Sequence, residues 1–413
     1  MPPIRFIHAA DLHLDAAFSG LSRDIPADFA ERLRTATFTA FRRLLDLCER
    51  ESPDFLLLAG DVYNQEDASV SAQLALRDGF RRLESLSIPV FLVHGNHDPL
   101  ASRLRSVRWP GNVTVFGELP DAVPVFRKGE GTPLAIIHGA SHASGRETRN
   151  LAALFRRTEA CGLHVGLLHA TPGDADGVAR YAPFSQGDLK ASGMDYWALG
   201  HIHHPQLIPE DDPAIAFSGC IQGRDIHETG PHGVLKVTLR ENLPTEVAFL
   251  PTAQIVWERI EVDVSACATI ADIQEAITTQ QFERNARSQC QNMLCRITLT
   301  GATPLHSALT SHVLADLRSV INDRYPFFFI DDVVNETRAK IDKDAIEKEG
   351  LFPAVYLSTM RAQKKDKVDG LSYLEQQFSA LDLPVPKLQR RFDEACKEAE
   401  SLVFDLLSEN NND

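Results

Sequence analysis

Several common features are missing from this chain of 413 residues, and each absence narrows its class. No apolar run approaches the roughly 20 residues of a membrane-spanning helix. No basic stretch followed by an apolar segment opens the chain, so we expect neither a membrane anchor nor a secretion signal. No Gly-x-x-x-x-Gly-Lys-Ser/Thr loop occurs, which excludes ATP binding by that phosphate-binding route.

Cysteine is sparse, and basic residues are in the minority. The seven cysteines are scattered without a Cys-x-x-Cys pair, which is typical of a reducing compartment, and we expect a cytoplasmic protein. The 42 Lys and Arg residues against 57 Asp and Glu give a net charge of −15. A protein that holds nucleic acid alone usually has a basic surface. Nucleic-acid binding by this chain would therefore need positive charge from bound metal ions or from a partner.

The sequence does contain a series of short apolar runs, each followed by a residue that can bind a divalent metal or transfer a proton at the metal site. Runs near residues 4–7, 55–58, 90–93, 134–137, 165–168 and 196–199 are typical of strands buried on both faces. Ligands of open α/β sheets gather beyond the carboxyl ends of such strands. The series therefore predicts a metal site. The polar residues that follow the runs are Asp11, His13, Asp61, Asn96, His97, Asp98, His138, His169, His201 and His203.

The number and chemistry of these donors indicate two ions. Side chains two apart share a face of an extended segment, so Asp11 and His13 can face one ion. His201 and His203 can likewise face one cavity while each takes a different ion. A mixed Asp, Asn and His shell suits Mn²⁺ first, with Mg²⁺, Fe²⁺ and Zn²⁺ as competitors. Two divalent ions outweigh two carboxylates and a hydroxide, so the pocket stays positive and favours a phosphate ester, which two-metal sites hydrolyse.

The motifs Asp11-x-His13, Gly60-Asp61, Gly95-Asn96-His97-Asp98, His169 and Gly200-His201-x-His203, in this order, resemble the calcineurin-like metallophosphoesterases. Residues 1 to about 240 resemble, more narrowly, the SbcD-type DNA repair exonucleases. The segments Ile7–Leu14 and Ser218–Arg224, followed by Glu228-Thr229-Gly230, are similar to the YhaO-like branch. Each short motif alone is weak, whereas five in order at strand ends are specific.

This resemblance implies a role for each residue. The first metal would be held by Asp11, His13, Asp61 and His203, and the second by Asp61, Asn96, His169 and His201, with Asp61 as the bridge. His97 would position the phosphate or protonate the leaving oxygen, and Asp98 would fix its tautomer. Asn64 departs from the pattern, because several relatives carry His or Asp there and an amide cannot act as that acid.

A structural role is the better interpretation of any single histidine, but so many polar groups at one spot would be costly to bury without metals. We expect His8 to be satisfied in the core or to support the site, and His94 to support the site, rather than to bind metal. A role facing the substrate stays open for His138 and His142.

The pattern of elements predicts three regions. Residues 1–250 alternate strand and helix and then add strands, which predicts an α/β fold, and the resemblance implies a two-sheet α/β/β/α sandwich. Residues 251–340 follow the order β-α-β-α-β and are predicted to form a smaller α+β capping domain. Residues 341–413 hold a charged linker and C-terminal helices. The helix expected over 387–408 has an apolar stripe that needs a partner surface.

These patterns favour a Mn²⁺-dependent DNA nuclease that hydrolyses phosphodiester bonds at DNA ends in DNA repair or defence. The resemblance implies that it is the catalytic subunit of a complex with a separate SMC-like coiled-coil ATPase, and we expect a homodimer or higher assembly. One alternative is a small-molecule phosphatase or cyclic-nucleotide phosphodiesterase with the same two-metal core. Another is a scaffold without turnover. The capping region favours the nuclease, because a small substrate needs no separate placement domain.

Overall fold

The computed structural model describes residues 3–21, 25–64, 70–102, 107–127, 131–158, 162–174, 179–208, 214–288, 292–325, 327–340 and 355. The chain divides into two compact units. The first comprises Met1–Arg259, Glu283–Arg296 and Tyr325–Asp331, and the second comprises Ile260–Phe282, Ile297–Arg324 and Asp332–Asp413. Among the described residues, no helix combines the length and the apolar character that crossing a membrane requires.

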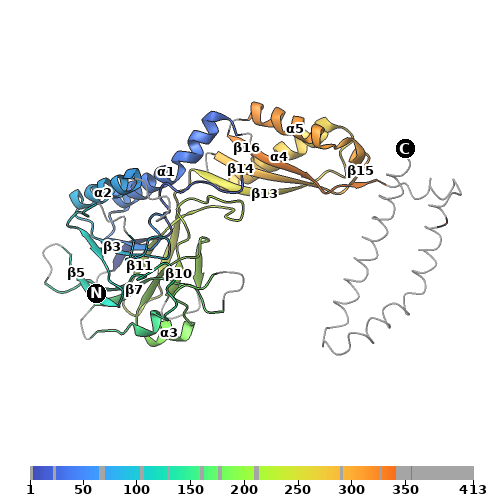
Figure 1. The fold of residues 1–413 in the computed structure, drawn as a ribbon. Coiled ribbons are helices and arrows are strands. Elements are labelled where there is room, and N and C mark those ends of the chain that lie inside the picture. Colours follow the sequence, from blue (N-terminus) through green and yellow to red (C-terminus); the bar gives the residue numbers. More distant parts are fainter. Residues whose placement is uncertain are drawn as a thin grey trace, which may run out of the picture. The chain divides into compact units, whose positions relative to one another are not determined.

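Two six-stranded sheets form the centre of the first unit (Figure 1). The first sheet contains β1 (Ile4–Ala9), β2 (Phe55–Ala59), β3 (Val90–Val93), β4 (Val113–Val115), β11 (Gly233–Leu239) and β12 (Glu246–Pro251). The second contains β5 (Asp121–Val125), β6 (Ala135–Ala140), β7 (Leu163–His169), β8 (Tyr196–Gly200), β9 (Gln206–Ile208) and β10 (Ala214–Phe217). Their orders are β12-β11-β1-β2-β3-β4 and β5-β6-β7-β8-β10-β9.

Parallel strands occupy the middle of both sheets. β1 to β4 run parallel, as do β6, β7, β8 and β10, whereas β11, β12, β5 and β9 each pair antiparallel with a neighbour. Because parallel neighbours point the same way, their carboxyl ends meet at one edge of each sheet.

Strands β2 and β3 of the first sheet are buried along their whole length, as their apolar runs predicted. Along β2, Phe55 and Leu57 pack in the core between the two sheets, and Leu56 and Leu58 pack against helices. These helices are α1 (Ala27–Glu51) and α2 (Val70–Ser85), which lie together over one face of the first sheet in Figure 1. Each fully buried Leu or Phe stabilises the fold by about 1.5–3 kcal/mol relative to exposure.

The outer face of the second sheet is covered by α3 (Gln186–Ala191) and the 3-10 helix η1 (Ala152–Leu154). Trp197 of β8 is fully buried there, with its ring 4.8 Å from that of Phe155, and its indole N–H donates to the Leu189 carbonyl (3.2 Å). The first unit therefore has the layers α/β/β/α, and the predicted two-sheet sandwich is confirmed.

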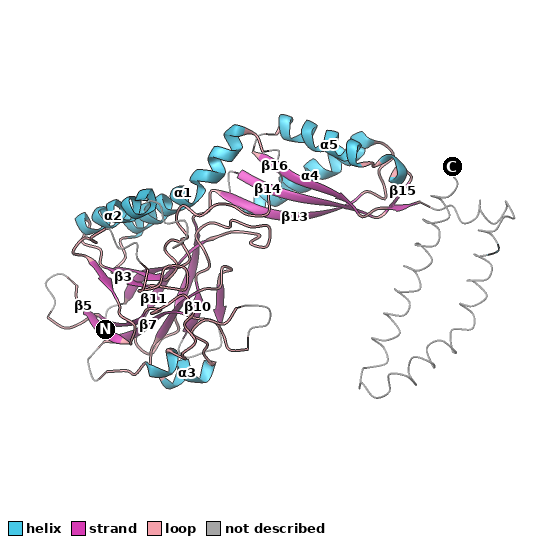
Figure 2. Cartoon of the chain, viewed as in Figure 1, coloured by secondary structure: helices cyan, strands magenta, loops and turns pink. Residues whose placement is uncertain are grey.

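Beyond residue 251 the described elements follow the order expected for a smaller α+β region (Figure 2). They are β13 (Ile255–Asp263), α4 (Ile270–Ser288), β14 (Asn292–Thr300), β15 (Ala302–Thr303), the 3-10 helix η2 (His306–Ala308), α5 (Ser311–Arg324), β16 (Phe328–Asn335) and β17 (Arg338–Ala339). β13, β14 and β16 form a three-stranded sheet, and β15 pairs with β17. A capping role for this region stays a prediction. The helices expected within 341–413 lie outside the described residues.

Candidate metal centre

The predicted donors meet where β1, β2, β3, β7 and β8 end. Ligand atoms of Asp11, His13 and His203 lie within 4.8 Å of one another, as do those of Asp11, Asp61 and His169. The amide oxygen of Asn96 lies 3.0 Å from His169 Nε2. The His201 ring centroid is 5.2 Å from that of His169. All seven residues predicted to bind metal therefore belong to one cluster.

Asp61 lies at the middle of this cluster. Its Oδ2 is 3.3 Å from His169 Nε2 on one side and 3.9 Å from His13 Nε2 on the other. His13 Nε2 is in turn 3.3 Å from His203 Nε2, which lies 3.8 Å from Asp11 Oδ1. The two predicted ligand groups thus meet at the Asp61 carboxylate, which is the geometry that a bridging ligand needs.

The backbone, rather than strand alternation, brings neighbouring donors together. Asp11, His13, Asp61 and His201 have φ values of 50°, 39°, 50° and 97°, in the left-handed region that non-glycine residues rarely adopt. The argument that Asp11 and His13 share the face of an extended segment is therefore wrong, because β1 ends at Ala9 and the chain turns sharply beyond it. Such strain is concentrated at functional sites, where the surrounding structure holds it in place.

Two glycines of the predicted motifs let the strand ends approach closely. A Cβ on Gly95 would lie 2.3 Å from Asp61 Oδ1, and one on Gly200 would lie 2.0 Å from the Ala59 carbonyl oxygen. Any larger residue at these positions would push the donor loops apart.

Each candidate histidine ligand is oriented by a partner at its other ring nitrogen. In His13, the Nδ1–H group donates to Asn64 Oδ1 (2.6 Å). The Nδ1–H group of His169 donates to the Ala59 carbonyl (2.9 Å). In His203, the Nδ1–H group donates to Glu228 Oε1 (2.5 Å). Nε2 of these three rings is then free to bind a metal. His201 uses the opposite ring nitrogen: its Nε2 contacts the Ala179 carbonyl (3.3 Å), and its Nδ1 is then free to bind a metal.

Two of these supporting residues had no predicted role. Asn64, noted only as a departure from the family pattern, fixes the tautomer of His13. Glu228 accepts from both His203 and the Arg224 backbone N–H (2.6 Å). Glu228 lies 25 residues beyond His203. No local spacing could reveal this contact, and the only signal was its place in the segment similar to the YhaO-like branch.

Burial and the two buried carboxylates shift the pKa values of the cluster in opposite directions. Burial lowers the pKa of His201 to about 3 and, with the nearby charge of Arg224, holds the pKa of His13 well below its usual value. Both rings are therefore neutral, the form that binds metal. Burial opposes ionisation of Asp61, but the adjacent His169 holds the pKa of that carboxyl well below the usual range. Burial likewise opposes protonation of His169, but the Asp61 and Asp11 carboxylates raise its pKa to about 9. A set of carboxylate, amide and imidazole donors suits ions of intermediate hardness.

His97 differs from the rest of the cluster because its side chain is exposed. Its backbone N–H donates to Asp61 Oδ1 (2.9 Å), and its ring centroid lies 5.1 Å from that of His13. The ring is thus beside the cluster and open to an incoming molecule.

The prediction that Asp98 fixes the tautomer of His97 is wrong. The buried Asp98 carboxylate accepts from the backbone N–H groups of Gly95 (2.7 Å), Val62 (3.1 Å) and Asp61 (3.2 Å), and Oδ2 lies 3.1 Å from His94 Nδ1. The sharp turn at Asp61 leaves these buried N–H groups without partners in a sheet, and they need an acceptor. Asp98 therefore secures the loops that carry Asp61 and Asn96.

Other histidines of the strand ends do not join the cluster. His8 accepts from the Tyr196 hydroxyl (3.1 Å) and donates to the Leu199 carbonyl (3.2 Å), which satisfies it in the core. His138 pairs with His164 (2.8 Å), and His142 donates to the His169 carbonyl (2.7 Å) behind the cluster.

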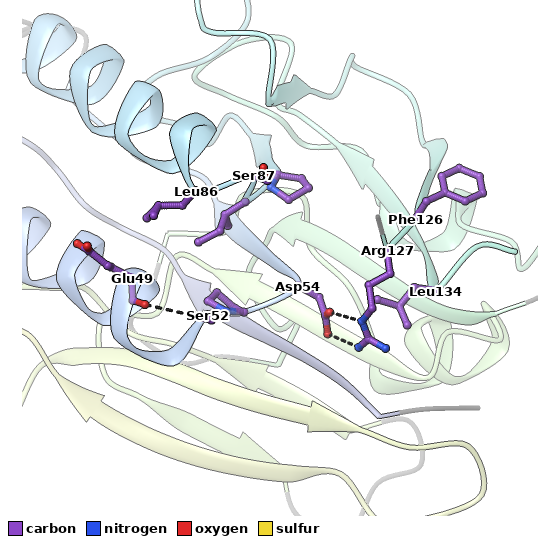
Figure 3. A pocket seen from close by; sticks show the side chains of 11 residues that line it. Glu49, Ser52, Asp54, Leu86, Ser87, Phe126, Arg127 and Leu134 are labelled. Atoms are coloured by element: carbon purple, nitrogen blue, oxygen red, sulfur yellow. Dashed lines mark hydrogen bonds and ion pairs between the residues drawn. The ribbon is translucent and has the colours of Figure 1, made fainter. Parts of the chain in front are cut away.

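A separate pocket of about 270 Å³ lies at the opposite, amino-terminal ends of β2 and β3 (Figure 3). Arg127 points toward Asp54 and pairs with it through two contacts of 2.9 and 3.0 Å. The pocket shares no residue with the metal cluster.

An α/β/β/α sandwich with this donor set at its strand ends defines a phosphoesterase of the two-metal type. Residues 4–205 match the calcineurin-like phosphoesterase family model, and residues 257–338 match the middle domain of metallophosphoesterase YhaO. The chain is 36% identical over 304 residues to metallophosphoesterase YhaO of Bacillus subtilis, a match that covers 73% of this chain and 72% of that protein. The chain belongs to the calcineurin-like phosphoesterase family.

Two further likenesses are more distant. The chain is 27% identical over 292 residues to the DNA double-strand break repair protein Mre11 of Aeropyrum pernix, which covers 64% of each chain. A solved structure of a dimetal phosphatase from Danio rerio is 13% identical with a TM-score of 0.35, covering 60% of this chain and 98% of that chain.

Proposed function

We propose that this phosphoesterase is a Mn²⁺-dependent nuclease that hydrolyses phosphodiester bonds at DNA ends. The observation that carries the proposal is the Asp61-centred cluster with the exposed His97 beside it. The similarity to a DNA double-strand break repair protein supports DNA as the substrate.

In this proposal Asp11, His13, Asp61 and His203 would hold one ion, and Asp61, Asn96, His169 and His201 would hold the other. When bound, the two ions would supply a hydroxide nucleophile and positive charge at the phosphate. His97 delivers a proton to the oxygen that leaves as its bond to phosphorus breaks. Glu228 and Asn64 keep the Nε2 atoms of His203 and His13 directed inward.

Manganese is favoured over magnesium by the imidazole ligands. Mg²⁺ prefers oxygen donors and loses its water reluctantly, whereas Mn²⁺ accepts a mixed nitrogen and oxygen shell. Four histidines surround the two carboxylates in the cluster, so the site discriminates against Mg²⁺.

The test compares linear double-stranded DNA with bis-p-nitrophenyl phosphate, using purified protein in Mn²⁺ and in Mg²⁺ with Mn²⁺ rigorously removed. We expect both substrates to be cleaved in Mn²⁺, and DNA at least tenfold more slowly in Mg²⁺. Cleavage of the chromogenic diester without cleavage of DNA would favour a small-molecule phosphodiesterase. Equal rates in the two metals would contradict the proposed metal preference.

We also propose that a separate SMC-like ATPase completes the enzyme. A net charge of −15 and the lack of a phosphate-binding loop support a subunit that takes DNA affinity and ATP hydrolysis from a partner. Deletion of residues 371–413 is expected to abolish co-purification of that ATPase from the source cells and to leave cleavage of bis-p-nitrophenyl phosphate intact. Retention of the ATPase by the shortened chain would place its docking surface elsewhere.

A further inference from the structure

A second group of metal-binding side chains lies on the side of His203 that faces away from the Asp61 cluster, and it contains a cysteine. Cys220 Sγ, a carboxylate oxygen of Glu228 and a ring nitrogen of His203 all lie within 4.8 Å of one another. His232 adds a further donor, because its Nδ1 lies 3.1 Å from Cys220 Sγ. Neither Cys220 nor His232 belongs to the motifs that predicted the two-metal centre.

The cysteine and this histidine are held in place by their surroundings. Both are fully buried. The backbone N–H of Cys220 donates to the His203 carbonyl (3.0 Å). The Nε2–H group of His232 donates to the Glu228 carbonyl (3.1 Å), so its Nδ1 presents a lone pair to the thiol. A sulfur and a nitrogen donor therefore face each other in a preformed arrangement.

The spacing and chemistry of these donors favour Zn²⁺. With Zn–S of about 2.3 Å and Zn–N of about 2.0 Å, the two ligand atoms of a tetrahedral site lie about 3.5 Å apart, near the 3.1 Å between Cys220 Sγ and His232 Nδ1. An ion can replace the thiol proton that this contact shares. Thiolate and imidazole select Zn²⁺ over Mn²⁺ and Mg²⁺, which favour shells richer in oxygen.

Glu228 connects this group to the two-metal centre. Its Oε1 accepts from His203 Nδ1 (2.5 Å), and these two side chains are 14% and 27% exposed, so an ion can enter past them. Ligand atoms of one Zn²⁺ lie roughly 3 Å or more apart, which leaves no room for an ion between Glu228 and His203 as they stand. An ion that takes the Glu228 carboxylate must therefore separate it from His203.

We propose that Cys220, His232 and Glu228 form a Zn²⁺ site that inhibits the phosphoesterase when it is filled. Cys220 would bind as the thiolate and release its proton to solvent, and a water molecule would take the fourth position. His203 would then lose the acceptor that directs its Nε2 toward the centre, and the loss of such a partner weakens a metal ligand. The inference goes beyond the proposed function, because it concerns neither the substrate nor the two ions of the centre.

The first test titrates the Mn²⁺-loaded protein with Co²⁺, a spectroscopic substitute for Zn²⁺. Co²⁺ gives a thiolate-to-metal charge-transfer absorption only where a cysteine binds it, and the donors of the two-metal centre include no sulfur. We expect this absorption in the wild type, its loss in Cys220→Ser, and Co²⁺ binding weakened about tenfold or more in His232→Gln. Cys267→Ser is the matched control, because Cys267 is also buried and free but lies in the second unit, and it should keep the absorption.

The second test adds Zn²⁺ while bis-p-nitrophenyl phosphate is hydrolysed in saturating Mn²⁺. Without Zn²⁺, turnover by Cys220→Ser is expected to stay within about twofold of the wild type, because the thiol is not a ligand of the centre. The Zn²⁺ concentration that halves turnover should rise about tenfold or more in this variant, and it should not change in Cys267→Ser.

An absorption that is absent from the wild type, or retained by Cys220→Ser, would overturn the Zn²⁺ site. Equal sensitivity of the wild type and Cys220→Ser to Zn²⁺ would overturn its inhibitory role. Loss of Mn²⁺ from Cys220→Ser would also overturn the inference, because Cys220 would then support His203 by packing. Failure to cleave DNA would refute the nuclease proposal alone, since neither test uses DNA.

Discussion

Replacement of Asp61 with alanine is expected to abolish phosphoester hydrolysis and to lower the occupancy of both metal ions. The Asp61 carboxylate lies between His169 Nε2 at 3.3 Å and His13 Nε2 at 3.9 Å, so the variant loses the group common to the two predicted ligand sets. Without it, four imidazoles face one another with a single carboxylate, and each ion loses a charged ligand. Elemental analysis of the purified variant, together with an activity assay, measures both effects.

Asp78→Ala provides the control for Asp61→Ala. Asp78 lies on α2 with 59% of its side chain exposed, and its removal should leave metal content and activity unchanged. If Asp61→Ala retains one ion at full occupancy, Asp61 serves only the other, and its role as a bridge is refuted.

His97→Ala is expected to reduce turnover by about 10²–10⁴-fold, the usual contribution of a general acid, while both metals stay bound. His97 contacts Asp61 through its backbone N–H, a contact that alanine preserves. The variant thus removes the exposed imidazole without disturbing the bridge. Turnover of linear DNA, whose leaving alkoxide needs a proton, and metal content are measured on the same preparation.

The matched control for His97 is His312→Ala, since His312 lies on α5 with 85% of its side chain exposed. That variant should retain full activity. A drop in metal content for His97→Ala alone would identify His97 as a ligand and would contradict its assignment as an acid.

The parts of the fold that depend on local patterns were predictable from the sequence. The strands expected near 55–58 and 90–93 are β2 and β3, because buried apolar runs bounded by turn residues are sufficient to mark them. Strand β11 lies beside β1 in the sheet, and its Leu239 pairs with Ile4 although more than 220 residues separate them in the chain. Tertiary packing decides this position, and no local signal reveals it.

The same limit applies to the site. The residue types at the strand ends were sufficient to predict which donors gather, because parallel strands deliver them to one edge. The reason given for Asp11 and His13 was wrong, since it assumed extended backbone where φ is 50° and 39°. Asp98 was misassigned because its neighbour in sequence is not its partner in space. The positions of Glu228 and Arg224 near the cluster could not be predicted, because they depend on a loop that returns to the end of β1 only in the folded chain.

The donors come from both sheets: Asp11, Asp61 and Asn96 follow strands of the first, whereas His169, His201 and His203 end or follow strands of the second. Any ion bound among them would cross-link two layers that are also held by apolar packing and by hydrogen bonds such as that from His8 of β1 to the Leu199 carbonyl of β8. Ligand binding to the native state alone adds about 2.7 kcal/mol at a concentration of 100 times Kd. The free energy of unfolding of the sandwich is therefore expected to depend on the supply of divalent metal, so that a chain starved of metal would lose stability as well as activity.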